Sequence, residues 1–327
     1  MKKHLSTLLK FTISLGLGLV IVWFTFSRLT SEEMRLMRSA FANANYWWLI
    51  LGAFINFTSN YFRTERWRML LKPLGYTPSF INTFLSVIVM YFANLLFPRL
   101  GEVMRCGILT RYEKIPVDKS IGTMVTERLV DVLTLPIIIG ILLLVEKDRF
   151  YEALSGTQAI TKNFSNNPLY SYILYGIVGL LIIFVLYKNI TDKFWIGRIQ
   201  QFIIGIFQGL KSILKTENPL LFIFHSVMIW VCFFVAGYVS LFALPETSDV
   251  GPWAALALMF FGALAYTAVQ GGVGAYPLVA AKLLLVYGVA ETIGLSYGWL
   301  SWTVQTGLVI IGGLLSLLIL TLINKEA

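Results

Sequence analysis

NLLFPRLGEVMRCGILTRYEKIPVDKSIGTMVTERLVD, residues 94–131, begins at the end of one apolar run and ends inside another. The charged side chains that this stretch carries include Arg99, Glu102, Arg105, Arg111, Glu127, Arg128 and Asp131. Ionised side chains at the mouth or in the wall of a membrane segment cost free energy, so they usually have a function. The stretch therefore predicts a polar pocket that binds a lipid headgroup.

The composition indicates a membrane protein. Of the 327 residues, 57% are hydrophobic and 13% are charged, whereas soluble domains average about 25% charged residues. Several apolar runs approach the ~20 residues with which a helix crosses a bilayer. We therefore expect an all-α polytopic membrane protein in which residues 1–327 form a single transmembrane domain of the inner (plasma) membrane.

The formal net charge of +9 comes from lysines and arginines that cluster beside the apolar runs. This distribution indicates membrane orientation and contact with anionic lipid, and it argues against a nucleic-acid partner. Lysines around the first apolar run, residues 11–26, and Lys325 near the other end place both termini in the cytoplasm. The cysteines and histidines form no metal or redox pattern, so we expect no metal and no cofactor.

The apolar run at residues 80–97 is followed by Pro98 and Gly101, which favour the end of a helix. The next segment, residues 99–119, contains five lysines and arginines. If the run crossed the membrane completely, this basic segment would lie outside, against the positive-inside tendency. We therefore expect a re-entrant helical hairpin that enters from the cytoplasm, breaks at residues 98–101 and returns through residues 102–110.

A second interrupted segment follows the apolar run at residues 253–270. Its glycines precede another apolar piece, residues 277–289, that is too short to cross a bilayer. This pattern predicts a second re-entrant hairpin, which enters from the outside. Besides the two hairpins we expect about six full transmembrane helices. Because the hairpins have opposite orientations, we expect the halves at residues 46–145 and 220–324 to form an inverted repeat. Residues 193–215 are amphipathic and predict an interfacial helix on the cytoplasmic leaflet.

The candidate site lies where the first hairpin meets the fourth apolar helix, residues 121–145. Glu127 and Asp131 are four residues apart and share a helical face, and Arg128 is three residues from Asp131. Lone charges in hydrocarbon are expensive, so we expect partners for them. The available partners are Arg99, Glu102 and Arg105. A purely architectural ion-pair network is the alternative to a binding site.

Further candidates lie at both ends of the predicted pocket. Arg63 and Arg66 follow the second helix, residues 47–62, and indicate either headgroup contact or plain positive-inside anchoring. On the other side of the pocket we expect the polar side chains of Tyr266, Thr267 and Gln270. Backbone amides of Gly271, Gly272 and Gly274 are candidates to meet an anionic headgroup. Close helix packing by small residues is the alternative for these glycines.

Three motifs carry a resemblance to one membrane-protein family: Pro98-x-x-Gly101-Glu102-x-x-Arg105, Glu127-Arg128-Leu129-x-Asp131 and Gly271-Gly272-x-Gly274. Nearly the whole chain resembles the lysylphosphatidylglycerol synthase transmembrane region, also called the flippase-like or YbhN-type family. The resemblance implies a membrane domain that moves an aminoacylated phospholipid between leaflets. It does not extend to the soluble aminoacyltransferase domain of the full-length synthases, so we do not expect that activity here.

The second hairpin departs from the family pattern. Members of the family commonly have the sequence Pro-Gly-Gly-x-Gly-x-x-Glu at this position. This chain instead has Gln270 before the glycines and Pro277 at the position of the Glu. This departure argues against carrying over an acidic coordinating role to this hairpin.

Three functions are open. A lipid flippase or carrier would hold the headgroup of an anionic or aminoacylated phospholipid, or of a polyprenyl-phosphate lipid, with Arg99 and Arg105 on the phosphate. An integral-membrane enzyme on lipid-linked substrates would use Glu127 and Asp131 as acid and base. A non-transporting membrane partner would serve a separate synthase or transferase. We favour the first and expect no enzyme activity.

Overall fold

The computed structural model describes residues 16–97, 99–147, 149 and 216–325. Every secondary-structure element in these ranges is an α-helix or a short 3-10 helix, which confirms the all-α prediction. The interfacial helix expected at residues 193–215 lies outside the described residues.

The helices of the first half are α2 (Ser31–Asn43), α3 (Tyr46–Leu71), η1 (Lys72–Leu74), α4 (Phe80–Leu96), α5 (Leu100–Glu113) and α6 (Val117–Val145). Those of the second half are α10 (Pro219–Leu241), η2 (Pro245–Thr247), α11 (Gly251–Ala268), η3 (Gln270–Gly272), α12 (Ala275–Val286) and α13 (Glu291–Ile323). A further apolar helix, Gly16–Ser27, precedes α2.

Among the described helices, α6, α10, α11 and α13 are long and apolar enough to cross a membrane. The chain is therefore a multi-pass membrane protein, as expected. The helix α11, which we expected to be one arm of a re-entrant hairpin, is among these four. The length and composition of a helix do not distinguish the arm of a re-entrant hairpin from a helix that crosses the whole membrane. The re-entrant hairpins therefore stay a prediction.

The predicted boundaries need two corrections. The second helix does not end near residue 62 but continues to Leu71 as α3, because its charged residues are good helix formers and several of them find partners inside the protein. It ends where Pro73 starts η1 and Gly75 adopts φ 87°. The apolar run near the C-terminus predicts a last helix at about residues 299–323, whereas α13 begins earlier, at Glu291.

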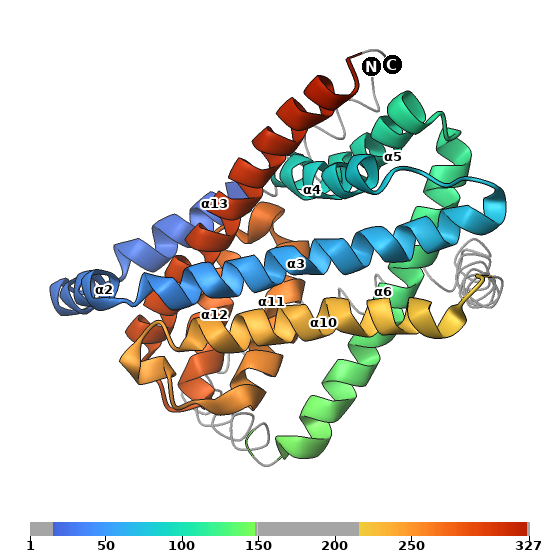
Figure 1. Cartoon of the computed structure of the whole chain (residues 1–327). Helices are drawn as coiled ribbons and strands as arrows, with labels where there is room; N and C mark the ends of the chain where they lie inside the picture. The colour runs from blue at the N-terminus through green and yellow to red at the C-terminus, as the bar shows by residue number, and fades with distance from the viewer. Residues whose placement is uncertain (1–15, 98, 148, 150–215, 326–327) are drawn as a thin grey trace, which may run out of the picture.

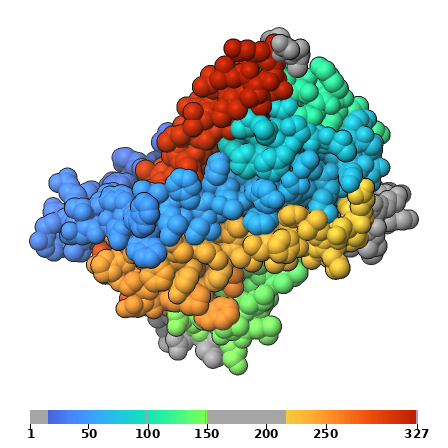
Figure 2. All heavy atoms as spheres, viewed as in Figure 1, coloured from blue at the N-terminus to red at the C-terminus, as the bar shows by residue number. Residues whose placement is uncertain are grey.

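The helices α3 and α10 run antiparallel side by side (Figure 1). At one end the backbone N–H of Asn45 donates to Ala243 O at 2.8 Å, and at the other Lys72 pairs with Glu217 at 2.5 Å. Figure 2 shows these two helices across one face of the molecule, with α13 (red) and α4 (cyan) against α3. With its 26 residues, α3 is about 39 Å long, enough to span the molecule and a bilayer.

Two helical hairpins meet tip to tip. The helices α4 and α5 pack against each other, as do α11 and α12, and η3 at the second tip contacts α4. The side-chain amide of Gln270 donates to the backbone carbonyl of Asn94. At the tips, Arg99 has φ 62°, and Gly271 and Gly272 have φ 62° and 69°, values that glycine adopts without strain and arginine rarely does.

The largest buried apolar cluster is formed by α10, α11, α12 and α13 with parts of α2, α3 and α6, and Tyr297 is fully buried in it. A smaller cluster fills the space between α3, α4 and α5. Its buried members are Trp67, Leu71, Val87, Met90, Leu109 and Ile115. Trp67 and Met90 of this second cluster contact Arg105, one of the charged residues described below, so the apolar cluster helps to bury them.

Candidate functional site: a buried cluster of ion pairs

Five ionised side chains from three helices meet inside the protein. They are Arg63 and Arg66 of α3, Arg105 of α5, and Glu127 and Asp131 of α6; we call them the buried cluster. The side chains of Arg66 and Arg105 are 0% exposed and that of Glu127 is 1% exposed. Asp131 is the most accessible member, with 15% of its side chain exposed.

Glu127 lies at the centre of the buried cluster. Its Oε1 accepts hydrogen bonds from Arg63 Nη1 at 2.7 Å and from Arg66 Nη2 at 3.2 Å, and its Oε2 accepts from Arg105 Nη2 at 2.6 Å. One carboxylate thus binds three guanidinium groups. Such charge-assisted hydrogen bonds are about twice as strong as neutral ones.

Asp131 lies one helical turn further along α6. Its Oδ2 is 3.0 Å from Arg63 Nη1 and its Oδ1 is 2.8 Å from Arg66 Nη1. Arg66 Nη1 also donates to the hydroxyl of Ser226 in α10 at 3.4 Å. The two carboxylates therefore bridge the same pair of arginines, and α10 closes the cluster from the side.

Helical spacing explains how the sequence brings these groups together. Arg63 and Arg66 are three residues apart and Glu127 and Asp131 are four apart, so each pair occupies one face of its helix. Arg105 reaches the same place from α5, where its guanidinium lies 3.7 Å from the centre of the Trp67 ring. This cation–π contact fixes the arginine and is stronger when it is desolvated, as here.

A partly exposed ion pair adjoins the buried cluster. Arg128 Nη2 donates to Glu102 Oε1 at 3.1 Å and contacts the sulfur of Met90 at 3.5 Å. Arg128 Nη1 is also 3.8 Å from Asp131 Oδ2. Asp131 therefore connects the dry interior of the site with this outer pair.

Six of the predicted site residues meet here. The structure brings together Arg66, Glu102, Arg105, Glu127, Arg128 and Asp131. It adds Arg63, which we had weighed only as an anchor or headgroup contact at the helix end. The signal that could have included Arg63 was its position on the same helical face as Arg66, with acidic partners on another apolar helix.

The other predicted site residues lie at the hairpin tips. Arg99 is exposed at the α4–α5 turn. Gln270 contacts Asn94 across the two tips, and the indole N–H of Trp302 donates to Gly271 O at 2.8 Å. These contacts hold the second tip in place and do not join it to the buried cluster.

The remaining candidates pack locally around the second tip. The ring of Tyr266 lies next to Gly272, where a Cβ would come within 2.9 Å of it, and 5.4 Å from the ring of Tyr276. Gly274 packs against the helix Gly16–Ser27, with a Cβ position 3.1 Å from Gly18 O. Close approach of backbone to neighbouring groups accounts for glycine at both positions.

Within the described ranges, no group of three or more His, Cys, Asp or Glu side chains is placed to hold a metal ion. Both cysteines are buried and free. The chemistry that the buried cluster offers is therefore that of its guanidinium and carboxylate groups. Guanidinium groups favour bidentate contact with a phosphate or a carboxylate.

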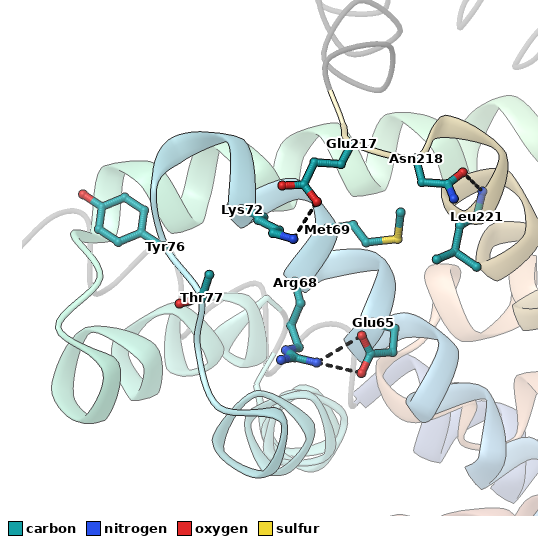
Figure 3. A pocket seen from close by; sticks show the side chains of 9 residues that line it. All are labelled: Glu65, Arg68, Met69, Lys72, Tyr76, Thr77, Glu217, Asn218 and Leu221. Atoms are coloured by element: carbon teal, nitrogen blue, oxygen red, sulfur yellow. Dashed lines mark hydrogen bonds and ion pairs between the residues drawn. The ribbon is translucent and has the colours of Figure 1, made fainter.

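A separate cavity of about 330 Å³ lies at the ends of α3 and α10 (Figure 3). It is lined by Glu65, Arg68, Met69, Lys72, Tyr76, Thr77, Glu217, Asn218 and Leu221. Its charged residues are paired, Arg68 with Glu65 at 2.8 Å and Lys72 with Glu217 at 2.5 Å. By helical spacing, Glu65 and Arg68 face away from Arg63 and Arg66 on α3. This cavity is therefore not part of the buried cluster.

The helices and the ion pairs enclosed between three of them define an α-helical, multi-pass membrane protein with a charged interior site. The chain belongs to the family of the lysylphosphatidylglycerol synthase TM region, whose sequence model matches residues 8–323. It is also similar to a UPF0104 membrane protein of Methanocaldococcus jannaschii, with 33% identity over 92 residues. That alignment covers 27% of this chain and 27% of the relative. No solved structure matches the chain.

Proposed function

We propose that this protein is a lipid flippase or carrier that binds the headgroup of a phospholipid or polyprenyl lipid at the buried cluster. The single observation that carries the proposal is the enclosure of three arginines and two carboxylates between α3, α5 and α6. Replacing a buried ion-pair network with apolar side chains is often neutral or stabilising. A network of this size in a membrane protein therefore favours a role in binding over a role in stability.

The helix contacts support the proposed inverted repeat. If α3, α4, α5 and α6 are exchanged with α10, α11, α12 and α13, several contacts map onto each other. The pair α3–α4 becomes α10–α11, α5–α6 becomes α12–α13, and α4–α13 becomes α11–α6, and all of these pairs are in contact. Repeats with interrupted helices at matching positions are typical of transporters whose site lies near the membrane midplane.

The proposed membrane orientation follows from the basic residues. The arginine-rich end of α3 and both termini face the cytoplasm of the inner membrane. The α4–α5 hairpin then enters from the cytoplasmic leaflet and the α11–α12 hairpin from the outer one. The buried cluster is closed in the present conformation, so a headgroup reaches it after the α4–α5 hairpin moves away from α6.

The contacts of the two carboxylates favour binding over acid–base catalysis. Both oxygens of Glu127 accept hydrogen bonds from arginines, and both oxygens of Asp131 lie within 3.0 Å of an arginine nitrogen. A general acid or base must reach a substrate proton directly or through one water. We therefore propose that these groups orient the arginines and that the protein is not an enzyme.

Lipid transfer in proteoliposomes tests the proposal. The wild-type protein is expected to move a tail-labelled phospholipid between leaflets faster than protein-free vesicles do. Arg105→Met is expected to reduce that rate at least ~10-fold, because it removes a guanidinium from the site and leaves two arginines with two carboxylates. The rate is measured as the labelled lipid that becomes accessible to a membrane-impermeant quencher.

Arg111→Met is the matched control. Arg111 lies on the same helix, is exposed, and stacks on its neighbour Tyr112 at 5.3 Å. This variant should keep the wild-type rate. Equal rates for Arg105→Met and the wild type, or no transfer of any polar lipid by the wild type, would contradict the proposed function.

A further inference from the structure

The charges of the buried cluster do not balance. Three arginines face two carboxylates, so the cluster carries one positive charge in excess. The outer pair of Arg128 and Glu102 adds one charge of each sign and does not change this excess. Uncompensated charge in a dry interior is costly, and a bound counter-ion removes that cost.

Each arginine of the cluster also has an unused donor. The Nε–H groups of Arg63, Arg66 and Arg105 are buried and have no hydrogen-bond acceptor. Buried polar groups in proteins are nearly always paired, and an exception needs an explanation. Unpaired donors on groups that carry excess positive charge favour an anionic ligand.

The two carboxylates differ in what they do for this site. Glu127 is fully enclosed and binds all three arginines, so it holds the cluster together. Asp131 binds two arginines and is partly accessible, at the border between the cluster and Arg128. Asp131 is therefore the carboxylate whose charge is most readily changed without opening the site.

We propose that Asp131 determines the headgroup charge that the buried cluster accepts. With Asp131 ionised the cluster lacks one negative charge, which a phosphodiester supplies. A phosphomonoester carries about 1.5 to 2 negative charges near pH 7 and overcompensates the cluster. This inference rests on the function proposed above and adds its specificity-determining residue.

The test compares phosphatidylglycerol, a phosphodiester, with phosphatidic acid, a phosphomonoester, at identical acyl chains and pH 7.5. Binding of each lipid to the purified full-length protein in detergent is measured by native mass spectrometry. The wild type is expected to prefer phosphatidylglycerol about 10-fold, and Asp131→Asn to lower or reverse that ratio by about 10-fold. The asparagine keeps the shape of the side chain and removes one negative charge.

Three further variants separate charge from shape. Asp131→Glu keeps the charge and should keep the wild-type ratio. Asp118→Asn removes an exposed carboxylate at the start of the same helix, 73% exposed, and should also leave the ratio unchanged. Adding Ser226→Asp to Asp131→Asn returns a negative charge beside Arg66, whose Nη1 is 3.4 Å from the serine hydroxyl, and should restore the preference for phosphatidylglycerol.

The outcomes distinguish this inference from the function on which it rests. Binding of both lipids with an unchanged ratio in Asp131→Asn overturns the role of Asp131 and leaves the lipid site intact. Failure of the wild type to bind either lipid overturns this inference and, with it, the binding of anionic phospholipids at the buried cluster. If Asp131→Asn does not fold, Ser226→Asp alone is decisive. It balances the cluster without a ligand and should weaken phosphatidylglycerol binding about 10-fold, and unchanged binding contradicts the inference.

Discussion

Replacing Glu127 with glutamine is expected to lower the free energy of unfolding by about 3–5 kcal/mol, the usual cost of removing one partner from a buried ion pair. The amide has the size of the carboxylate, so no cavity forms. It loses the charge that holds three guanidinium groups and places an N–H donor against an arginine, which also donates. The measurement is reversible unfolding of the purified protein in mixed micelles.

Glu102→Gln is the matched control, because it makes the same change in the partly exposed pair. Glu102 is 19% exposed and its partner Arg128 is 38% exposed, and ion pairs in contact with solvent contribute about 0–1 kcal/mol. The loss of stability should therefore be several-fold smaller. Equal losses for the two variants would mean that Glu127 does not hold the cluster together as its contacts indicate.

Gly101→Ala is expected to destabilise the protein by about 1–3 kcal/mol, because the added methyl group overpacks the contact between α4 and α5. A Cβ at this position would overlap the carbonyl oxygen of Met90 and lie 2.8 Å from the side-chain carbon of Asn94. Backbone atoms of a helix cannot move aside as the end of a side chain can. The hairpin would have to open and lose the hydrogen bond from Gly101 N–H to Asn94 Oδ1, now 2.9 Å.

Lipid transfer should fall together with stability in this variant, since Arg105 lies one turn further along α5 and would move with it. Gly107→Ala on the same helix is the control. A Cβ at Gly107 meets no atom within 4 Å, and alanine in place of a helical glycine stabilises by about 0.5–1 kcal/mol. The two glycine variants should therefore change the unfolding free energy in opposite directions, and a shared direction would contradict the assigned packing.

Much of the site could be predicted from the sequence because its spacing is local. Glu127 and Asp131 lie four residues apart in an apolar helix, and that pattern alone indicated a paired, inward-facing set of charges. The family resemblance rested on the same residues, and the match over residues 8–323 confirms it. The break between α4 and α5 was also predictable, since Pro98 precedes a glycine in an otherwise apolar run.

The rest depends on tertiary packing, which local patterns do not encode. From the sequence, the arginines of α3 indicated either headgroup contact or anchoring at the end of a helix, because only the folded protein brings the carboxylates of α6 to them. The contact between Gln270 and Asn94 joins distant segments through a backbone carbonyl, which any residue could offer. For the same reason the sequence did not separate the hairpin tips, with Arg99 and the glycines, from the buried cluster.

The most direct test of the central claim is a cryo-electron microscopy map of the protein in nanodiscs made with phosphatidylglycerol. We expect density for a lipid headgroup between α3, α5 and α6, with its phosphate within hydrogen-bonding distance of Arg63, Arg66 or Arg105. Lipid density confined to the outer surface, with the five side chains still paired only with each other, would contradict the account.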